Sequence, residues 1–246
     1  MTIHTPFYAF QSALTSEECN KIINLGLKKE PEEAETFGNN QKNVNKEIKQ
    51  ADKTTQELQK ELSKNIGEIA PYVRDSTISW INDVWIYERI YPFLLEANEK
   101  SGWKYEFESA EDFQFTTYKN GGFYGWHLDC GTCHNYVYLK NVPDEEKIKG
   151  KEKFYTDNPN LVGKIRKLSV TINLSKPDDY EGGNLKFDWG DHQPNNRYYE
   201  CEEIRPQGSI VVFPSFWYHQ VTPVTKGTRH SLVCWVLGAP FKWSYL

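Results

Sequence analysis

Apolar and polar positions divide this chain into a helical first part and a strand-rich second part. A capping-box pattern runs from Thr15 to Glu18, and apolar residues then recur every three or four positions, as in an amphipathic helix. Residues 78–81 have the composition of a strand, and residues 85–98 predict a second helix that Pro92 either bends or starts. Both helices therefore precede residue 110.

From residue 113 onward the pattern is that of many short strands. Glycines punctuate this region as turns, at 121–122, 182–183 and 208. The expected strands cover residues 113–118, 124–129, 168–174, 185–188, 209–213, 219–221 and 230–237. Short strands with glycine turns behind a helical segment indicate a mainly β fold, in which a double-stranded β-helix, or jelly roll, is braced by N-terminal helices.

The chain has neither an internal repeat nor a linker, so we expect one domain over residues 1–246. Residues 1–110 would form the helical support, and residues 111–240 the jelly-roll core. Between about residues 33 and 64, large apolar side chains are rare and Asn, Gln, Lys and Glu are common. Such a segment buries little, and it is expected to be either a mobile polar surface segment or a lid beside a substrate cleft.

Composition excludes several functional classes. The formal net charge of -5 argues against sequence-independent binding of nucleic acid, because no broad basic field is available. No apolar run approaches the roughly 18 residues of a membrane-spanning helix, and the N-terminus lacks a signal-peptide pattern. Five cysteines, an odd and scattered set, do not suggest a disulfide framework. We expect a cytoplasmic protein with neither a membrane nor a nucleic-acid partner.

Four dispersed residues carry the candidate chemistry. His127 and Asp129 are separated by one residue, so on a strand their side chains would point to the same face. With His219 from a distant strand they would offer two nitrogens and one oxygen on one side of a metal, the pattern of non-haem Fe(II) oxygenases. Arg229 on a core strand would need a partner, and a carboxylate cosubstrate could bind it through two parallel hydrogen bonds.

A cysteine motif directly follows this segment. Cys130-Gly131-Thr132-Cys133-His134 has the spelling of a c-type haem attachment site, but haem attachment would require an exported protein. A zinc site built from Cys130, Cys133 and His134 is a second interpretation, and loop cysteines without a ligand are the third and simplest. His134, His192 and His230 are not expected to bind the metal of the His127 site.

The order of the motifs resembles the 2-oxoglutarate- and Fe(II)-dependent oxygenases of the prolyl 4-hydroxylase type over roughly residues 74–240. The segments that carry the resemblance are Gln114-x-x-x-Tyr118, His127-x-Asp129, Arg166-x-x-Ser169, Glu181-Gly182-Gly183-Asn184-Leu185, His219-x-Val221 and Gly227-x-Arg229. The resemblance implies a dioxygenase that hydroxylates a prolyl residue while it decarboxylates 2-oxoglutarate to succinate and CO2. It further implies Fe(II), 2-oxoglutarate and O2 as cofactor and cosubstrates, with ascorbate in a supporting role.

The resemblance also implies a task for individual residues. The iron ligands would be His127, Asp129 and His219. Arg229 would bind the distal carboxylate of 2-oxoglutarate, with Tyr118 close to the cosubstrate and the metal. Arg166 and Trp235 would hold the substrate proline. Arg166 lies in a basic run and could instead belong to a solvated rim, and Trp235 could instead be core.

One position departs from the family pattern. Members of the family often have a tyrosine before the leucine that corresponds to Leu174, where it helps to bind the distal carboxylate, and this chain has Asn173. Thr171 or Ser231 is expected to supply the missing hydrogen bond.

Three functions are compatible with the sequence. The leading hypothesis is a hydroxylase of a prolyl residue in a peptide or protein, active as a monomer or homodimer. The second is the same chemistry on a free amino acid or another small molecule. The third is a metal-free jelly-roll binding module, against which the joint presence of His127, Asp129, His219 and Arg229 argues, because such a module needs none of them.

Overall fold

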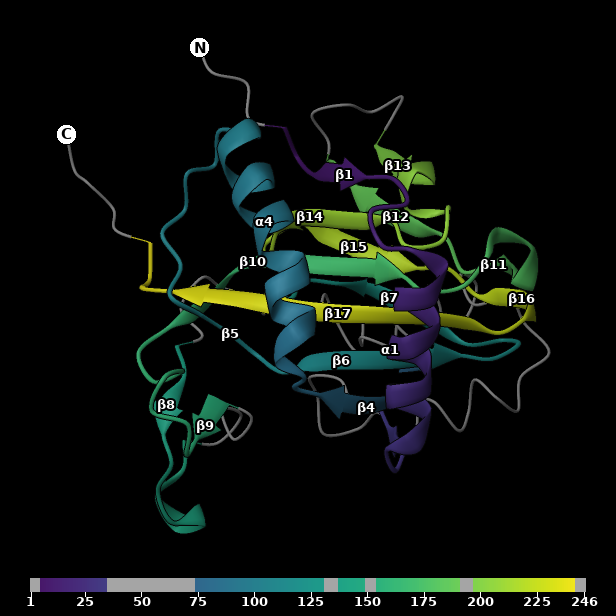
Figure 1. Cartoon of the computed structure of the whole chain (residues 1–246). Helices are drawn as coiled ribbons and strands as arrows, with labels where there is room; N and C mark the ends of the chain where they lie inside the picture. Colours follow the sequence, from purple (N-terminus) through teal and green to yellow (C-terminus); the bar gives the residue numbers. More distant parts are fainter. Residues whose placement is uncertain (1–4, 35–73, 131–136, 149–153, 191–196, 242–246) are drawn as a thin grey trace.

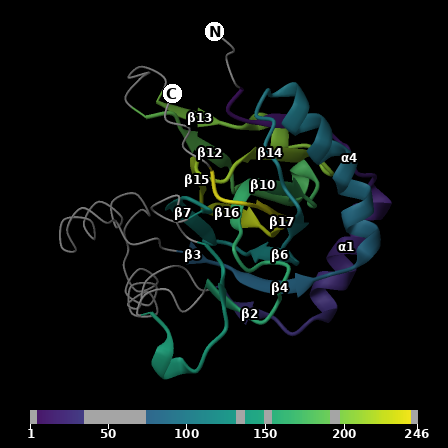
Figure 2. The same ribbon diagram turned by 90° about the vertical axis from the view of Figure 1, so that its left-hand side faces the viewer.

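The computed structural model describes residues 5–34, 74–130, 137–148, 154–190 and 197–241. In these residues two antiparallel sheets face each other, and two helices cover the outer face of the larger sheet (Figure 1, Figure 2). The helices are α1 (Ser16–Lys28) and α4 (Val84–Lys100). The predicted mainly β fold with N-terminal helices bracing the sheets is therefore confirmed, although short strands lie before and between the helices.

The main sheet contains the longest strands and supplies the floor of the candidate site. Its strands follow the order β1 (Tyr8–Phe10), β14 (Ile210–Pro214), β10 (Ile165–Asn173), β17 (Arg229–Gly238), β6 (Phe113–Tyr118), β4 (Thr77–Ile81) and β2 (Glu32–Glu33), and β5 (Ser109–Ala110) pairs with β17. The central strand is β17, which is flanked by β10 and β6. Residues 35–64 of the expected polar segment lie outside the described residues.

A smaller sheet lies over the inner face of the main sheet. It contains β13 (Tyr198–Glu200), β12 (Leu185–Asp188), β15 (Tyr218–Val221), β7 (Phe123–His127) and β3 (Arg74–Asp75), in that order. Two further pairs of strands are β11 (Tyr180–Gly182) with β16 (Val224–Gly227), and β8 (Leu139–Lys140) with β9 (Tyr155–Thr156). Short 3-10 turns lie at Asp144–Glu146, Pro177–Asp179 and Glu202–Ile204.

The helices form where the sequence predicts them. The side chain of Thr15 accepts a hydrogen bond from the amide of Glu18, and the carboxylate of Glu18 accepts one from the amide of Thr15, so the predicted capping box is present. Pro92 lies in the middle of α4 rather than in its first turn. Within the described residues, neither helix is both long and apolar enough to cross a membrane.

Alternation along β17 separates the core from the site. Leu232, Cys234 and Val236 point toward the helices and join the core that α1 and α4 cover. The residues between them point the other way and line a pocket between the two sheets, together with Arg229 at the start of the strand. One strand therefore stabilises the helix-facing core on one side and positions functional side chains on the other.

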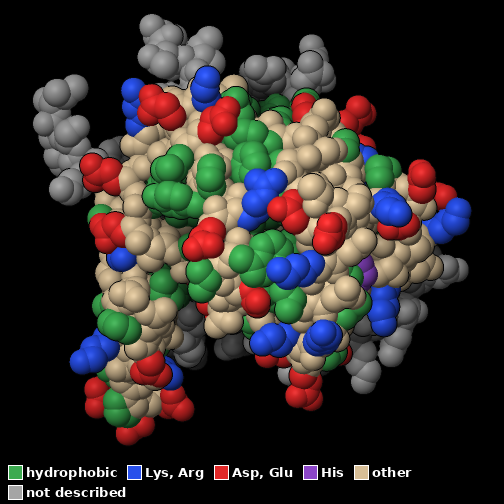
Figure 3. Space-filling model, viewed as in Figure 1, with side chains coloured by type: hydrophobic (Ala, Val, Ile, Leu, Met, Phe, Trp, Pro, Cys, Tyr) green, Lys and Arg blue, Asp and Glu red, His purple; other side chains and the backbone are tan. Residues whose placement is uncertain are grey.

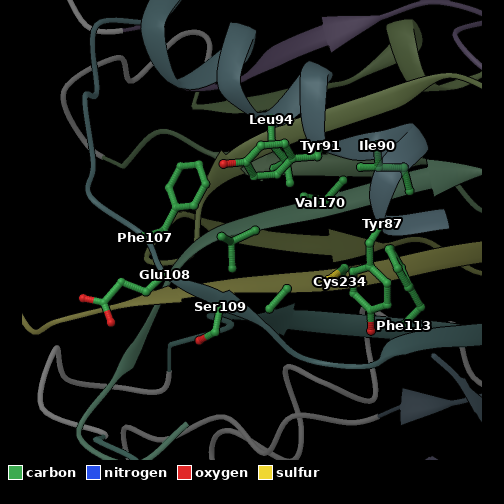
Figure 4. Close-up of a pocket in the computed structure, with 12 residues that line it drawn as sticks. Tyr87, Ile90, Tyr91, Leu94, Phe107, Glu108, Ser109, Phe113, Val170 and Cys234 are labelled. Carbon is green, nitrogen blue, oxygen red and sulfur yellow. The ribbon is translucent and has the colours of Figure 1, made fainter. Parts of the chain in front are cut away.

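The helix-covered face of the molecule is chemically mixed. Figure 3 shows acidic and basic side chains interspersed with apolar ones over the described part of this face, without a continuous basic surface. A cavity of about 200 Å³ lies beneath it, between α4 and the main sheet (Figure 4). Ile90 and Leu94 line it from α4, and Val170 and Cys234 line it from the strands.

This cavity makes the packing of α4 testable. Ile90 is 1% exposed and already borders the cavity, so Ile90→Ala enlarges a void that its neighbours do not fill. The free energy of unfolding should fall by about 2–5 kcal/mol. Leu95 on the same helix is 46% exposed, and Leu95→Ala should change the free energy by about 0.5 kcal/mol or less. Urea denaturation measures both variants, and an equal loss in the two would contradict the described packing of α4.

Candidate metal centre and adjoining pocket

The two strands that carry the histidines are neighbours in the smaller sheet. His127 is the last residue of β7, and the strand register sets it opposite His219 of β15. Asp129 does not lie on the strand, which corrects the expected strand over residues 124–129. The chain turns after His127 because the amides of Asp129 and Cys130 both donate to the carbonyl of Ser215, at 3.0 and 3.2 Å, and not to a neighbouring strand.

The three side chains nevertheless converge. Their potential ligand atoms all lie within 4.8 Å of one another, and all three residues are buried. Nε2 of His127 is 3.6 Å from Oδ1 of Asp129, and Nε2 of His219 is 3.6 Å from Oδ2. Two ligands that bind one ion at roughly 2.0–2.2 Å lie at most about 4.4 Å apart, so these separations fit a common ion.

Hydrogen bonds on the far side of each imidazole orient its ring. Nδ1 of His127 donates to the carbonyl of Gly125 at 2.8 Å, and Nδ1 of His219 donates to the carbonyl of Trp217 at 2.9 Å. Because a carbonyl only accepts, the proton of a neutral ring lies on Nδ1 and the lone pair on Nε2 points toward Asp129. With both rings neutral, the donor set is two nitrogen lone pairs and one carboxylate.

The electrostatics of the cluster favour a bound cation. Burial alone would raise the pKa of Asp129, but the neighbouring imidazoles of His219 and His127 outweigh burial and hold the pKa of this carboxyl well below its usual range. Burial, assisted by the charge of His127, lowers the pKa of His219 to about 4. At neutral pH an ionised carboxylate therefore faces a neutral, unprotonated His219, which is the state that binds a metal.

Arg229 lies in the pocket that adjoins this cluster. Its side chain is almost fully buried, and Nε and Nη1 have no hydrogen-bond partner among the described residues. Its guanidinium lies 5.5 Å from the centre of the Tyr118 ring, and Ser231 and Thr171 line the same pocket. A buried guanidinium without a partner costs free energy, so the pocket is suited to an incoming anion.

Asn173, at the departure from the family pattern, does not line this pocket. Its side-chain amide donates to the carbonyls of Ser175 and Arg205, at 3.0 and 2.8 Å, and so holds two loop segments together. The residue that replaces the family tyrosine therefore has a structural role in this chain.

Trp235 lines the pocket, and Arg166 lies against it, beside Asp129. The guanidinium of Arg166 is 3.7 Å from the centre of the Trp235 ring, and Nη1 donates to the backbone carbonyl of Asp129 at 3.1 Å. Nε and Nη2 both donate to the carboxylate of Glu111 at 2.6 Å. The interpretation of Arg166 as part of a solvated basic rim is therefore wrong, because its charge is mostly buried and paired.

Several residues of the site had no predicted role. Arg74 lines the pocket, donates to Gln114 at 2.9 Å, and lies 4.5 Å from the ring of Tyr124. Tyr124 stacks on His127 with ring centres 3.5 Å apart. Gln114 and Tyr124 lie among the motifs around the metal ligands, so the sequence could have indicated a role for them at the site. It offered no such indication for Glu111, because its partner Arg166 is 55 residues away.

The remaining histidines and cysteines do not join this cluster in the described part of the chain. His230 stacks on Phe115, with ring centres 5.3 Å apart, on the helix-facing side of β17 and away from the pocket. Cys133, His134 and His192 lie outside the described residues, so the zinc interpretation stays a hypothesis.

A family model described as the 2OG-Fe(II) oxygenase superfamily matches residues 113–237, which is just over half of the chain. A PKHD-type hydroxylase from Stenotrophomonas maltophilia is 32% identical over 123 residues, which cover 50% of this chain and 41% of that protein. Another from a Picosynechococcus species is 37% identical over 82 residues, which cover 33% of this chain and 34% of that protein. The chain thus matches well under two thirds of the length of these relatives.

Solved structures share the fold. A viral collagen prolyl hydroxylase from Paramecium bursaria chlorella virus 1, solved with 2OG, superposes with a TM-score of 0.55 at 15% identity, covering 97% of this chain and 99% of the other. An oxidoreductase of the 2OG-Fe(II) oxygenase family from Burkholderia pseudomallei gives a TM-score of 0.53 at 16% identity, covering 96% and 88%. At this level of identity the likeness establishes the jelly-roll fold and no more.

The metal centre can be tested by comparing two histidines. His219→Ala should weaken binding of a divalent probe such as Co(II) by more than the roughly 10–100-fold that loss of an outer-shell partner costs, because it removes one of three donors. His230→Ala, on the opposite face of the main sheet, should bind like the unmodified protein. Anaerobic titration calorimetry measures both. Equal affinities in the two variants would remove His219 from the site.

Proposed function

The chain belongs to the 2OG-Fe(II) oxygenase superfamily, and on that premise we propose that it is a dioxygenase that hydroxylates a prolyl residue in a peptide or protein. One observation carries the proposal. A convergent His–Asp–His cluster lines the same pocket as Arg229, a buried arginine whose Nε and Nη1 have no hydrogen-bond partner among the described residues. A metal-free binding module would have no use for the cluster or the arginine, and burying both would lower its free energy of unfolding.

The residues present fit a divalent iron ion. His127, Asp129 and His219 would hold it on one side, which leaves positions open on the side of the pocket. Bound there, Fe(II) would supply the redox chemistry by which O2 converts 2-oxoglutarate and a C–H group into succinate, CO2 and an alcohol. The hydrogen bonds from the two Nδ1 atoms keep the imidazoles aligned before any ligand arrives.

Arg229 would bind and orient the cosubstrate. A guanidinium binds a carboxylate through two parallel hydrogen bonds, and burial in this pocket strengthens them. We assign the distal carboxylate of 2-oxoglutarate to Arg229, with hydroxyl groups from Ser231, Thr171 and Tyr118 on the same pocket wall. The 2-oxo acid end would then face the metal cluster.

The rest of the pocket would exclude water. Apolar side chains from both sheets, among them Leu185, Phe213 and Val233, line it between the cluster and the arginine. In such surroundings charge-assisted contacts are stronger than in water, and a reactive oxidant is protected from side reactions. Residues of the protein therefore contribute positioning and exclusion of solvent rather than acid–base catalysis.

We assign the substrate proline to the wall formed by Trp235 and Arg166. The indole of Trp235 lines the pocket and offers apolar surface for the ring, and Arg166, which lies against this indole, offers N–H donors for a nearby carbonyl. We further propose that residues 1–246 act as one catalytic unit, because α1 and α4 share a core with the main sheet. Ascorbate is expected to sustain turnover. The same chemistry on a free amino acid is the alternative.

Substitution of Arg229 tests the cosubstrate site. Arg229→Ala should raise the 2-oxoglutarate concentration for half-maximal succinate formation by about 30-fold or more, because loss of a buried charged contact costs about 2–5 kcal/mol. Arg229→Lys keeps the charge and should have a smaller effect. Unchanged 2-oxoglutarate dependence in the alanine variant would remove Arg229 from the proposed site.

The activity itself has a direct assay. Protein purified without oxygen is supplied with Fe(II), 2-oxoglutarate, ascorbate and air, and is offered a panel of proline-containing peptides and, separately, free amino acids. Mass spectrometry should find peptides heavier by one oxygen atom, with succinate formed in equal amount. Oxygen incorporation into free amino acids alone would contradict the peptidyl-proline assignment and leave the oxygenase chemistry standing.

A further inference from the structure

The two arginines assigned to ligands differ in their charge balance. Arg229 is buried, and its Nε and Nη1 have no hydrogen-bond partner among the described residues. Its positive charge is therefore available to bind an anion. Arg166 is held by the carboxylate of Glu111 through two hydrogen bonds of 2.6 Å each. A bidentate pair of this kind leaves the Arg166 wall with no net charge. Of these two arginines, Arg229 lines the pocket with its charge unbalanced, and Arg166, which lies against the pocket residue Trp235, is neutralised.

Glu111 is fixed at this position from three directions. Its amide donates to the carbonyl of Trp235 at 2.9 Å, and its own carbonyl accepts from the hydroxyl of Tyr87 at 3.1 Å. Its carboxylate also accepts a hydrogen bond of 2.8 Å from the hydroxyl of Tyr138. The carboxylate is nearly as buried as the core, so it cannot turn away from Arg166 into water when a substrate arrives.

Donors remain for a neutral group. Among the described residues, three of the five N–H groups of Arg166 donate hydrogen bonds, two to Glu111 and one to the backbone carbonyl of Asp129. The indole Nε1 of Trp235 is buried and has no partner among the described residues. A carbonyl oxygen satisfies such donors without bringing charge. A carboxylate at the same place would lie beside the carboxylate of Glu111 and be repelled by it.

We propose that Glu111 sets the substrate class of this site: by neutralising Arg166, it makes the site accept the carbonyl of a residue inside a peptide and reject the carboxylate of a free amino acid or a C-terminal residue. The inference rests on the proposed function and decides between its two substrate alternatives. Glu111 acts through Arg166 and is a specificity-determining residue that touches neither the metal cluster nor the Arg229 site.

Two peptides that differ only in charge at one end test this inference. Both end at the target proline, one with a carboxamide and the other with a free carboxylate. The unmodified protein should hydroxylate the amide with a kcat/KM at least about tenfold higher, because like charges in contact cost more than the 1.4 kcal/mol of one decade. Glu111→Gln, which keeps the size of the side chain and exposes the charge of Arg166, should lower this ratio by about tenfold or more.

The matched control is Tyr138→Phe, which removes one hydrogen bond to Glu111 and leaves its charge. This variant should keep the amide-to-acid ratio, whatever it does to the absolute rates. If Glu111→Gln lowers both rates equally, its role is structural and the inference fails while the proposed function stands. If Glu111→Gln does not fold, the unmodified protein decides: equal or better use of the free acid overturns the inference.

The proposed function fails separately. Absence of oxygen incorporation into any proline peptide by the unmodified protein, with Fe(II) and 2-oxoglutarate present, would contradict the prolyl hydroxylase assignment itself and the inference with it.

Discussion

Two imidazole nitrogens and a carboxylate oxygen converge in a buried place, and the rest of the site is arranged around this convergence. The carboxylate of Asp129 is buried, and burying an ionised group costs free energy unless a cation balances it. The convergence persists because the register of β7 and β15, two hydrogen bonds from Nδ1 atoms and the carbonyl of Ser215 fix the three side chains independently. A dication would balance the buried carboxylate, so the three donors are positioned for a metal before one binds.

Charge balance then divides the pocket into regions with separate tasks. The metal cluster has a surplus of negative charge, Arg229 has an unbalanced positive charge, and Arg166 is balanced by Glu111. A dication would balance the cluster, and a dicarboxylate could then bind that ion at one end and Arg229 at the other. The Arg166 region gains most from a neutral hydrogen-bond acceptor. The alternation of side chains along β17 allows these regions to lie on one strand. Its pocket-facing side carries Arg229 near one end and Trp235 near the other, and its opposite side packs against the helices.

Local patterns in the sequence predicted most of the fold but little of the long-range pairing. Features that depend on neighbours within a few positions could be predicted. These are the capping box at Thr15, the helix α4 and the limits of the strands β12 and β15. Asp129 was placed on a strand because the i, i+2 spacing suits one, yet the carbonyl of Ser215, far along the chain, ends the strand earlier. The role of Glu111 could not be predicted, because it depends on how β5 and β10 lie on either side of β17. Asn173 was recognised as a departure, but only its contacts with Ser175 and Arg205 explain what it does.

An oxygen-free crystal structure with Mn(II) and 2-oxoglutarate tests the central claim most directly, because it locates the metal and both ends of the cosubstrate in one measurement. One ion should be bound by Nε2 of His127, an oxygen of Asp129 and Nε2 of His219 at roughly 2.0–2.2 Å. The distal carboxylate should lie on the guanidinium of Arg229, with Arg166 still paired to Glu111. A metal bound elsewhere, or a carboxylate that displaces Glu111 from Arg166 while Arg229 stays without a partner, would contradict it.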